Sequence, residues 1–143
     1  ACLAALPADI FIASAAVADY RPASAADQKM KKDTANEDGL TLTLVRNPDI
    51  LATLAEHSQR PDCCVGFAAE THDVLNYAAD KLQRKKLDLI VANDVSQSGI
   101  GFNSDDNAVT LIDRQLERCS LPQASKQKLA RQIIARIAGQ LNH

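Results

Sequence analysis

The sequence predicts an α/β fold, with a Rossmann-like, mainly parallel sheet flanked by helices. Residues 9–17, 63–69 and 87–92 form short apolar runs without polar alternation, which is typical of strands buried on both faces. Residues 73–86 and 125–141 instead carry apolar side chains at helical spacing. Strands that alternate with helices indicate a parallel sheet.

The first half of the chain is interpreted in order as follows. Residues 1–6 resemble the end of a helix that stops near Pro7, and the strand of residues 9–17 follows. The stretch from Arg21-Pro22 to Gln28 is predicted to be loop. Residues 40–45 alternate apolar residues with threonine, which predicts a half-buried strand.

The second half begins with a helix that we expect to run from Asn47-Pro48 to about Gln59, with Ile50, Leu51, Leu54 and Ala55 on its apolar face. Residues 73–86 form the next predicted helix, whose inward positions are Val74, Leu75, Ala78 and Leu82. Residues 108–112 alternate as an antiparallel or edge strand in a hairpin-like tail. The closing helix uses Leu129, Ile133, Ile134 and Ile137.

Composition narrows the class of protein. The chain has 143 residues, of which 46% are hydrophobic, and a formal net charge of −2. These values suit a single domain over residues 1–143. The small negative charge gives no overall field that favours nucleic acid or an anionic membrane. No apolar run is long enough to cross a bilayer, and no basic signal-peptide start is present. We therefore expect a cytoplasmic protein.

The cysteines and histidines predict no metal site. Cys63 and Cys64 are adjacent, Cys2 and Cys119 stand far from them, and no CxxC spacing occurs. The three histidines are scattered along the chain. We expect reduced thiols that are buried or idle, and no metal held by protein ligands alone.

The segment after the first strand has the residue types of a nucleotide site. Ala13, Ser14 and Ala15 are small enough for a ligand to approach the backbone, and Asp19 follows where the strand should end. Ligands of open α/β sheets bind beyond the carboxyl ends of strands. A KMKK run that begins at Lys29 suits a polyphosphate. The alternative is ordinary packing by small residues, followed by a solvated lysine run.

Residues 47–50 have two interpretations. Asn47 is a favourable N-cap, Pro48 a favourable first helical residue and Asp49 a favourable first-turn acid. Capping alone explains this pattern. The free N–H groups of such a helix start also suit an anion.

For Phe67 and two lysines, the residues alone leave both a structural and a functional interpretation open. Phe67, near a strand end, could stack on a base, although a core position is the commoner fate of phenylalanine. Lys81 and Lys85 are four residues apart and therefore neighbours on a helix surface. They could reach phosphates, or they could complement the negative end of the helix dipole.

Six motifs in order resemble those of one enzyme family. They are AAVADYRP (15–22), KMKK (29–32), NPDI (47–50), GFAAET (66–71), LDLIVAND (87–94) and GFNSDDN (101–107). Together they resemble bacterial phosphopantothenoylcysteine synthetase, the C-terminal half of a bifunctional coenzyme A biosynthesis flavoprotein. The resemblance spans nearly the whole chain from Asp9 onward.

The resemblance implies a CTP-dependent ligase. In this family the carboxylate of 4′-phosphopantothenate attacks the α-phosphate of CTP and forms an acyl-cytidylate, with release of pyrophosphate. The amine of L-cysteine then attacks the acyl carbon, expels CMP and leaves an amide. Mg²⁺ accompanies CTP and spreads the phosphate charge. Members pair as homodimers, so we expect an antiparallel extension near the dimer interface. We expect no FMN in this chain, because the flavin-binding half of the bifunctional protein is not part of the resemblance.

The resemblance also implies roles for individual residues. Lys29 matches the family's functional lysine, which is carried on a mobile flap over the site. Closing of the flap would exclude water. Asp19 would hold the nucleoside. The other implied nucleotide contacts are Ala13, Ser14, Ala15, Asn47, Pro48, Asp49, Ile50, Phe67, Lys81 and Lys85.

The sequence departs from the family pattern in one respect. The family's domain begins with a strand, a Gly/Ser-rich phosphate loop and a catalytic asparagine in an ISN-x-SSG motif, none of which occurs here. We therefore interpret the chain as the C-terminal portion of the domain, inactive by itself. A truncated, non-catalytic fragment that binds CTP and dimerises is the alternative. A Rossmann-like oxidoreductase is disfavoured because the GxGxxG fingerprint is missing.

Overall fold

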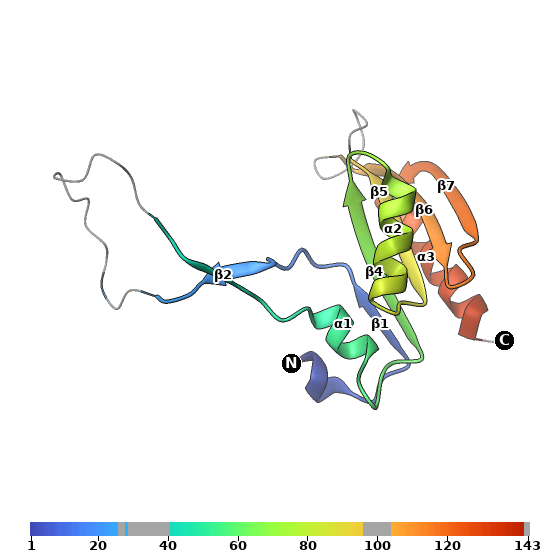
Figure 1. Cartoon of the computed structure of the whole chain (residues 1–143). Coiled ribbons are helices and arrows are strands. Elements are labelled where there is room, and N and C mark those ends of the chain that lie inside the picture. The colour runs from blue at the N-terminus through green and yellow to red at the C-terminus, as the bar shows by residue number, and fades with distance from the viewer. Residues whose placement is uncertain (26–27, 29–40, 96–103, 142–143) are drawn as a thin grey trace. The chain divides into compact units, whose positions relative to one another are not determined.

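The computed structural model describes residues 1–25, 28, 41–95 and 104–141 (Figure 1). The chain divides into two compact units, one of Ala1–Ser14 with Ile50–His143 and the other of Ala15–Asp49. In chain order the elements are η1 (Cys2–Ala5, a 3₁₀ helix), β1 (Ile10–Ala13), β2 (Tyr20–Pro22), β3 (Leu44–Arg46), α1 (Ile50–Ala55), β4 (Cys63–Glu70), α2 (Val74–Arg84), β5 (Leu89–Asp94), β6 (Asp106–Asp113), β7 (Arg118–Ser125) and α3 (Lys126–Leu141). Among the described residues, none of the helices combines the length and apolar character that a membrane span needs.

The larger unit is built on a five-stranded sheet in the order β1-β4-β5-β6-β7. β4 pairs in parallel with both β1 and β5, whereas β6 pairs antiparallel with both β5 and β7. It follows that β6 alone runs against the other four strands. The predicted mainly parallel, Rossmann-like sheet is confirmed.

Alternate side chains of the central strands enter two separate cores, one on each face of the sheet. Cys64 and Ile90 pack in the core that holds residues of α1 and α2. Val65 follows Cys64 and Leu89 precedes Ile90, and both pack with α3 in the other core. This two-residue period is the geometry of a strand buried on both faces. Figure 1 shows α2 and α3 on opposite faces of the sheet.

The two long helices lie where their apolar spacing predicts them. Ala78 and Leu82 of α2 are buried, and so are Leu129, Ile133 and Ile137 of α3. The predicted start of α3 is confirmed in detail, because the Ser125 hydroxyl accepts a hydrogen bond from the Lys128 N–H at 3.3 Å, as an N-cap does. One predicted core position is wrong: Ile134 is 52% exposed.

The first strand is shorter than predicted. β1 ends at Ala13, which pairs with Gly66, and the Ser14 N–H turns back to the Ile12 carbonyl at 3.2 Å. The residues beyond it are exposed. The interpretation of residues 21–28 as loop is also partly wrong, because Tyr20–Pro22 forms β2 and pairs antiparallel with β3.

The predicted strand of residues 40–45 needs correction too. The described strand is Leu44–Arg46, and its side chains are exposed rather than half-buried. Leu42 and Leu44 are 55% and 52% exposed. Alternation of apolar and polar residues therefore identifies a strand here but not a buried face, because nothing in the described part of the chain covers these leucines.

The predicted helix start at Asn47 is wrong. α1 begins at Ile50 and ends at Ala55, so Asn47 is not its N-cap, Pro48 and Asp49 precede it, and it stops before Gln59. The Asn47 amide is used elsewhere, since it donates to the Ala18 carbonyl at 2.7 Å. The predicted apolar face is confirmed at Leu51, Leu54 and Ala55, which are buried, but not at Ile50, which is exposed.

The last strand was not expected from the sequence. β7 covers Arg118–Ser125 and is mostly exposed, with Pro122 inside it. Proline cannot donate to a strand ladder and is found at sheet edges, which is where β7 lies. Residues 106–113 are longer than the predicted strand 108–112 and pair on both sides, so β6 is antiparallel but not an edge.

Candidate functional site

In the larger unit, some of the predicted site residues lie where the β1–β4 ladder ends, at the carboxyl end of β1. Ala13 is the last residue of β1 and pairs with Gly66 of β4. Ser14 is exposed immediately beyond it, and Phe67 follows Gly66 on the neighbouring strand. The carboxyl edge of parallel strands is the usual ligand edge of an open α/β sheet.

Lys81 of α2 reaches the part of β4 just past the last pair with β1. Its ammonium donates to the Phe67 carbonyl at 2.9 Å, one residue beyond the last pair between β1 and β4. The lysine therefore engages a backbone carbonyl that lies past the end of the β1–β4 ladder. The Phe67 ring is half-buried and packs against the core that contains α3. Core packing therefore explains part of why the Phe67 ring lies where it does.

Lys85 lies one turn beyond Lys81 and is the C-cap residue of α2. The helix ends in a Schellman motif, since the Leu87 N–H donates to the Leu82 carbonyl and the Lys86 N–H to the Gln83 carbonyl. Lys86 takes the left-handed conformation with φ 53°. Cations at this end complement the helix dipole, so the structural interpretation of Lys85 remains open beside the functional one.

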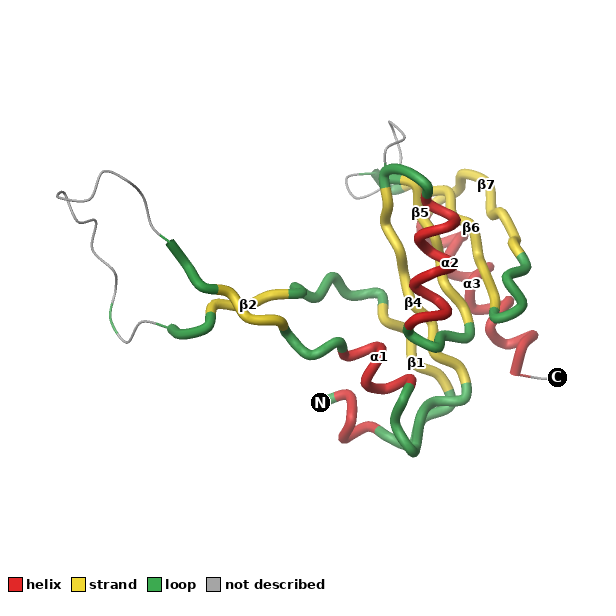
Figure 2. The backbone as a smooth tube through the Cα atoms, in the orientation of Figure 1, coloured by secondary structure: helices red, strands yellow, loops and turns green. Residues whose placement is uncertain are grey.

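The smaller unit brings Asp19 and Asn47 together. The Asn47 N–H donates to the Asp19 carbonyl at 2.8 Å, and the Asn47 side-chain amide donates to the Ala18 carbonyl at 2.7 Å. These bonds continue the β2–β3 ladder, whose last pair is Tyr20 with Arg46. Figure 2 shows the two paired strands of this ribbon in yellow.

The Asp19 carboxylate takes no part in these bonds. The residue is exposed, and its side chain has no hydrogen bond or ion pair among the described residues. A carboxylate with a fixed backbone and unused acceptor sites suits hydroxyl donors such as those of a ribose. Ala15 also lies in this unit and is exposed.

The remaining predicted residues are divided. Pro48 and Asp49 lie in the smaller unit and precede α1, whereas Ile50 in the larger unit is its first residue and is 39% exposed. Lys29 and the rest of the KMKK run lie outside the described residues, as do residues 101–103 of the GFNSDDN motif.

Two carboxylates at the same edge were not singled out from the sequence. Glu70 and Asp94 are register partners at the carboxyl ends of β4 and β5. The signal was present, because the second and third apolar strands each end in an acidic residue. Only the strand pairing tells that these two ends lie side by side.

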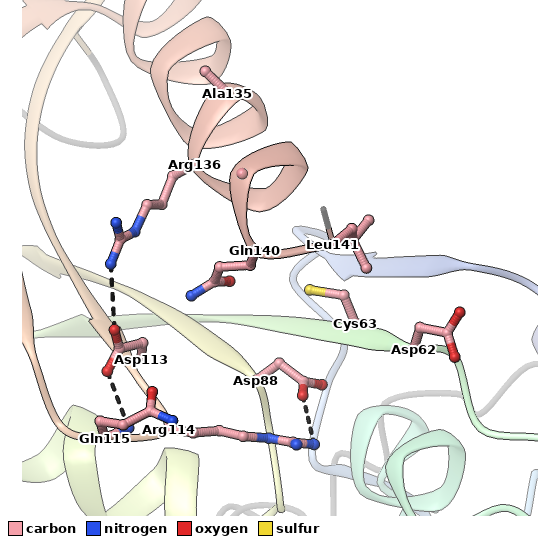
Figure 3. Close-up of a pocket in the computed structure, with 11 residues that line it drawn as sticks. Asp62, Cys63, Asp88, Asp113, Arg114, Gln115, Ala135, Arg136, Gln140 and Leu141 are labelled. Atoms are coloured by element: carbon pink, nitrogen blue, oxygen red, sulfur yellow. Dashed lines mark hydrogen bonds and ion pairs between the residues drawn. The ribbon is translucent and has the colours of Figure 1, made fainter. Parts of the chain in front are cut away.

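A separate cleft of about 650 Å³ lies at the opposite edge of the sheet. Its lining includes Cys63 at the start of β4, Asp88 just before β5, and the end of α3. Figure 3 shows Asp88 paired with Arg114, and Asp113 paired with Arg136. The cleft contains none of the predicted site residues.

The charged groups of this cleft are largely used within the protein. Asp88 also accepts from the Arg60 guanidinium at 2.6 Å and from the Cys64 N–H at 2.7 Å. Asp113 accepts the N–H groups of Gln115 and Glu117, both at 3.0 Å. These bonds join strand ends and turns, which indicates a structural role.

Cys63 and Cys64 are buried, free thiols. Burial is the largest of the causes that raise the pKa of Cys63 to about 11, and the nearby charges of Asp88 and Cys64 add to it. Burial also raises the pKa of Cys64. Neutral thiols of this kind are poor nucleophiles and poor metal ligands. Within the described ranges, no group of three or more His, Cys, Asp or Glu residues could hold a metal ion.

Comparison with known proteins adds sequence evidence. A family model described as DNA/pantothenate metabolism flavoprotein C-terminal domain matches residues 1–141. The chain is 53% identical over 135 residues to the coenzyme A biosynthesis bifunctional protein CoaBC of Vibrio vulnificus strain YJ016, covering 94% of this chain and 33% of that protein. The CoaBC proteins of Escherichia coli K12 and Bacillus subtilis 168 are 54% and 46% identical over 104 and 130 residues, which cover 73% and 91% of this chain and 26% and 31% of those proteins.

Two solved structures have the same fold. The crystal structure of the C-terminal domain of CoaBC matches with a TM-score of 0.70 and 35% identity, over 94% of this chain and 55% of that one. A DNA/pantothenate metabolism flavoprotein from Streptococcus pneumoniae matches with a TM-score of 0.66 at 21% identity, over 92% of this chain and 60% of that one, and supports the fold alone. The chain thus spans about a third of the length of the curated relatives that it matches.

Proposed function

Since this chain belongs to the DNA/pantothenate metabolism flavoprotein C-terminal domain family, we propose that it acts in coenzyme A biosynthesis. The proposed reaction is the CTP-dependent ligation of 4′-phosphopantothenate with L-cysteine through an acyl-cytidylate. The chain would supply the nucleotide-binding part of that site. The support is that a relative named as a coenzyme A biosynthesis protein matches 94% of this chain.

The observation that supports a nucleotide most directly is the Asp19 carboxylate. The backbone carbonyls of Asp19 and Ala18 are both fixed by Asn47, whereas the Asp19 carboxylate is exposed and has no partner in the part of the chain that the structure describes. Hydrogen bonds from hydroxyl groups to a charged acceptor are stronger than neutral ones. Asp19 is therefore the residue to which we assign the ribose hydroxyl groups.

The phosphates need positive charge, and we assign it to Lys81, Lys85 and Lys29. An anionic carboxylate that attacks an anionic phosphate is repelled unless cations spread the charge. Lys81 already holds the Phe67 carbonyl at 2.9 Å, so its contact with a phosphate requires a longer reach or a new rotamer. Lys29 is proposed as the catalytic lysine on the strength of its motif.

Mg²⁺ is proposed to arrive with the nucleotide. Such ions are held by phosphate oxygens together with one or two carboxylates. Glu70 and Asp94 are register partners at the carboxyl edge, and their hard oxygen donors fit this ion. When bound, Mg²⁺ would neutralise phosphate charge during the displacement.

Titration of the chain with Mg²⁺ and CTP by isothermal calorimetry tests this proposal. We expect saturable binding of CTP, weaker binding of GTP, and loss of at least tenfold in affinity in Asp19→Ala, which is about 1.4 kcal/mol. Asp62→Ala is the matched control, because Asp62 is also exposed but lines the cleft at the opposite edge. Equal affinity for CTP and GTP, or no binding of either, would refute the nucleotide assignment.

The alternative function is a fragment that binds CTP and dimerises without turnover. The observation in its favour is an exposed apolar ribbon, in which Tyr20, Leu44 and Val45 lie on paired strands. A second copy of this chain could cover these side chains. We expect a homodimer by sedimentation velocity, and a monomer after Leu44→Asn.

Product analysis tests whether this chain catalyses the ligation by itself. We expect this chain, given CTP, 4′-phosphopantothenate and L-cysteine, to form no amide product, because it has no ISN-x-SSG motif. A full-length relative serves as the positive control. Amide formation by this chain alone would contradict the alternative and would show that the motif is dispensable.

A further inference from the structure

We propose that Arg21 is a positioning residue for the nucleotide site, because it locks the Asn47 side chain that fixes the Asp19 backbone. The inference rests on the proposed function for its nucleotide. The bonds from Arg21 to the Arg46 carbonyl and Asn47, and from Asn47 to Ala18 and Asp19, here called the lock, lie within the smaller unit alone. The sequence predicts a loop at Arg21 and includes the residue in the AAVADYRP motif, but indicates no role for its side chain.

Arg21 bridges two acceptors on the neighbouring strand and its extension. Its Nη1 donates to the Arg46 carbonyl at 3.1 Å and to the Asn47 Oδ1 at 3.0 Å. Asn47 in turn donates from Nδ2 to the Ala18 carbonyl at 2.7 Å and from its backbone N–H to the Asp19 carbonyl at 2.8 Å. The chain of bonds runs from Arg21 through Asn47 to both peptide groups that flank the Asp19 α-carbon.

The chemistry of these partners fixes the orientation of the Asn47 amide. A guanidinium has only donors, so it must face the amide oxygen. A backbone carbonyl has only acceptors, so it must face the amide nitrogen. If the amide turned over, both contacts would become unfavourable. Arg21 therefore selects the orientation in which Asn47 holds the Ala18 carbonyl.

The lock matters because the ribbon is weak on its own. β2 and β3 share only three residue pairs, and two-stranded hairpins are marginally stable in water. Asp19 lies one residue beyond the last pair, where a strand end would otherwise fray. Ordering this backbone before the ligand arrives removes an entropy cost from binding. None of these bonds uses the Asp19 carboxylate, which can therefore bind the ligand.

Arginine suits this task better than lysine. Both bonds leave Nη1, whose two N–H groups are held in fixed directions by the planar guanidinium. An ammonium on a flexible stem holds its N–H groups less firmly. Arg21→Lys should therefore keep the charge and lose much of the lock.

The test measures amide hydrogen exchange by NMR together with Mg²⁺–CTP titration, using the whole chain. The variants are Arg21→Ala and Arg21→Lys. Arg46→Ala is the matched control, because it removes the same charge from the paired strand. The Arg46 side chain has no hydrogen bond or ion pair among the described residues, and only its carbonyl takes part in the lock.

In Arg21→Ala we expect the backbone N–H of Asn47 to exchange about tenfold faster and CTP to bind about tenfold more weakly. In Arg46→Ala we expect both quantities to change by less than about twofold. Arg21→Lys should lie between the wild type and Arg21→Ala. An Asn47 amide that is unprotected in the wild type, or equally protected in Arg21→Ala, would overturn the lock.

Two further outcomes separate this inference from its premise. Weaker CTP binding in Arg21→Ala with unchanged exchange at Asn47 would make Arg21 a direct ligand and would overturn its positioning role. If the wild type binds no CTP, the proposed function fails. The exchange rates then still decide whether the lock exists, and the role of Arg21 in nucleotide binding falls with its premise.

Discussion

Gly66 lies in a part of the core that is packed too closely for a side chain. A Cβ at Gly66 would lie 2.7 Å from Leu87 Cδ1 and 3.0 Å from Leu51 Cδ2, and both leucines are buried. We expect Gly66→Ala to lower the free energy of unfolding by about 1–3 kcal/mol, because overpacking displaces neighbouring side chains. Urea denaturation measures it.

Gly139→Ala is the control for this prediction. A Cβ at Gly139 would meet no atom within 4 Å, and the residue lies in α3. Alanine is the better helix former, so we expect a gain of about 0.5–1 kcal/mol. Equal effects of the two substitutions would contradict the packing argument at Gly66.

Cys63 gives the chain a dependence on alkaline pH. Its pKa in the folded protein is raised to about 11, chiefly by burial. The folded state keeps this proton at pH values where the unfolded thiol has lost it, so stability is full below the unfolded pKa and falls as pH rises toward 11. We expect Cys63→Ala to show a shallower decline in unfolding free energy between pH 9 and about 11. Parallel pH profiles in the two proteins would contradict this assignment.

At the scale of elements, Asp88 joins three parts of the larger unit. Its carboxylate binds Arg60 before β4, the Cys64 N–H in β4 and Arg114 after β6. The Asp88 side chain is 12% exposed, so solvent screens these bonds less than it screens bonds at the surface. We expect Asp88→Asn to cost about 2 kcal/mol of unfolding free energy, within the range for hydrogen bonds to charged groups.

The Glu56–Lys86 pair supplies the comparison. Both side chains are more than half exposed, at 56% and 64%. Exposed pairs contribute roughly 0–1 kcal/mol, so Glu56→Gln should have little effect in the same denaturation experiment. If Glu56→Gln cost as much as Asp88→Asn, burial would not be the cause of the difference.

At the scale of the whole molecule, the two units differ in what stabilises them. Every buried hydrophobic residue of the described chain lies in the larger unit, whereas Tyr20, Leu44 and Val45 of the ribbon are exposed. We expect amides of β4 and β5 to exchange orders of magnitude more slowly than those of β2 and β3, because a ribbon without a core opens locally. Hydrogen exchange at low protein concentration measures this.

The protein concentration is the control in that experiment. Protection of β2 and β3 that rises with concentration would indicate a second copy over the ribbon. Ribbon amides as protected as those of β4 at every concentration would contradict the prediction.

The long helices and the central strands could be predicted from the sequence because burial imposes a period on it. β4 and β5 are apolar on both faces, and α2 and α3 repeat apolar residues every three or four positions. The family could likewise be identified from ordered motifs, and the match over residues 1–141 confirms it. The nucleotide contacts drawn from those motifs remain predictions.

Short elements at the surface could not be predicted in this way. β2 and β3 are three residues each, and their side chains face no core. The alternation over residues 40–45 indicates a strand there but fixes neither its bounds nor its exposure, and the sequence predicts a loop at Arg21 and Pro22. β7 contains Pro122, which argues against a strand unless its place at the sheet edge is known. β2 and β3 each depend on a partner strand that is distant in sequence, whereas β7 pairs with β6 directly before it.

The sequence by itself determined the α/β class, the long helices, the buried strands and the family, because each of these is encoded by residues near one another in the chain. Tertiary structure alone decided that Asn47 holds the Ala18 and Asp19 carbonyls instead of capping α1, and that Lys81 binds the Phe67 carbonyl. The physical reason is that a polar side chain bonds to whichever partner the fold brings within reach, and local sequence does not specify that partner.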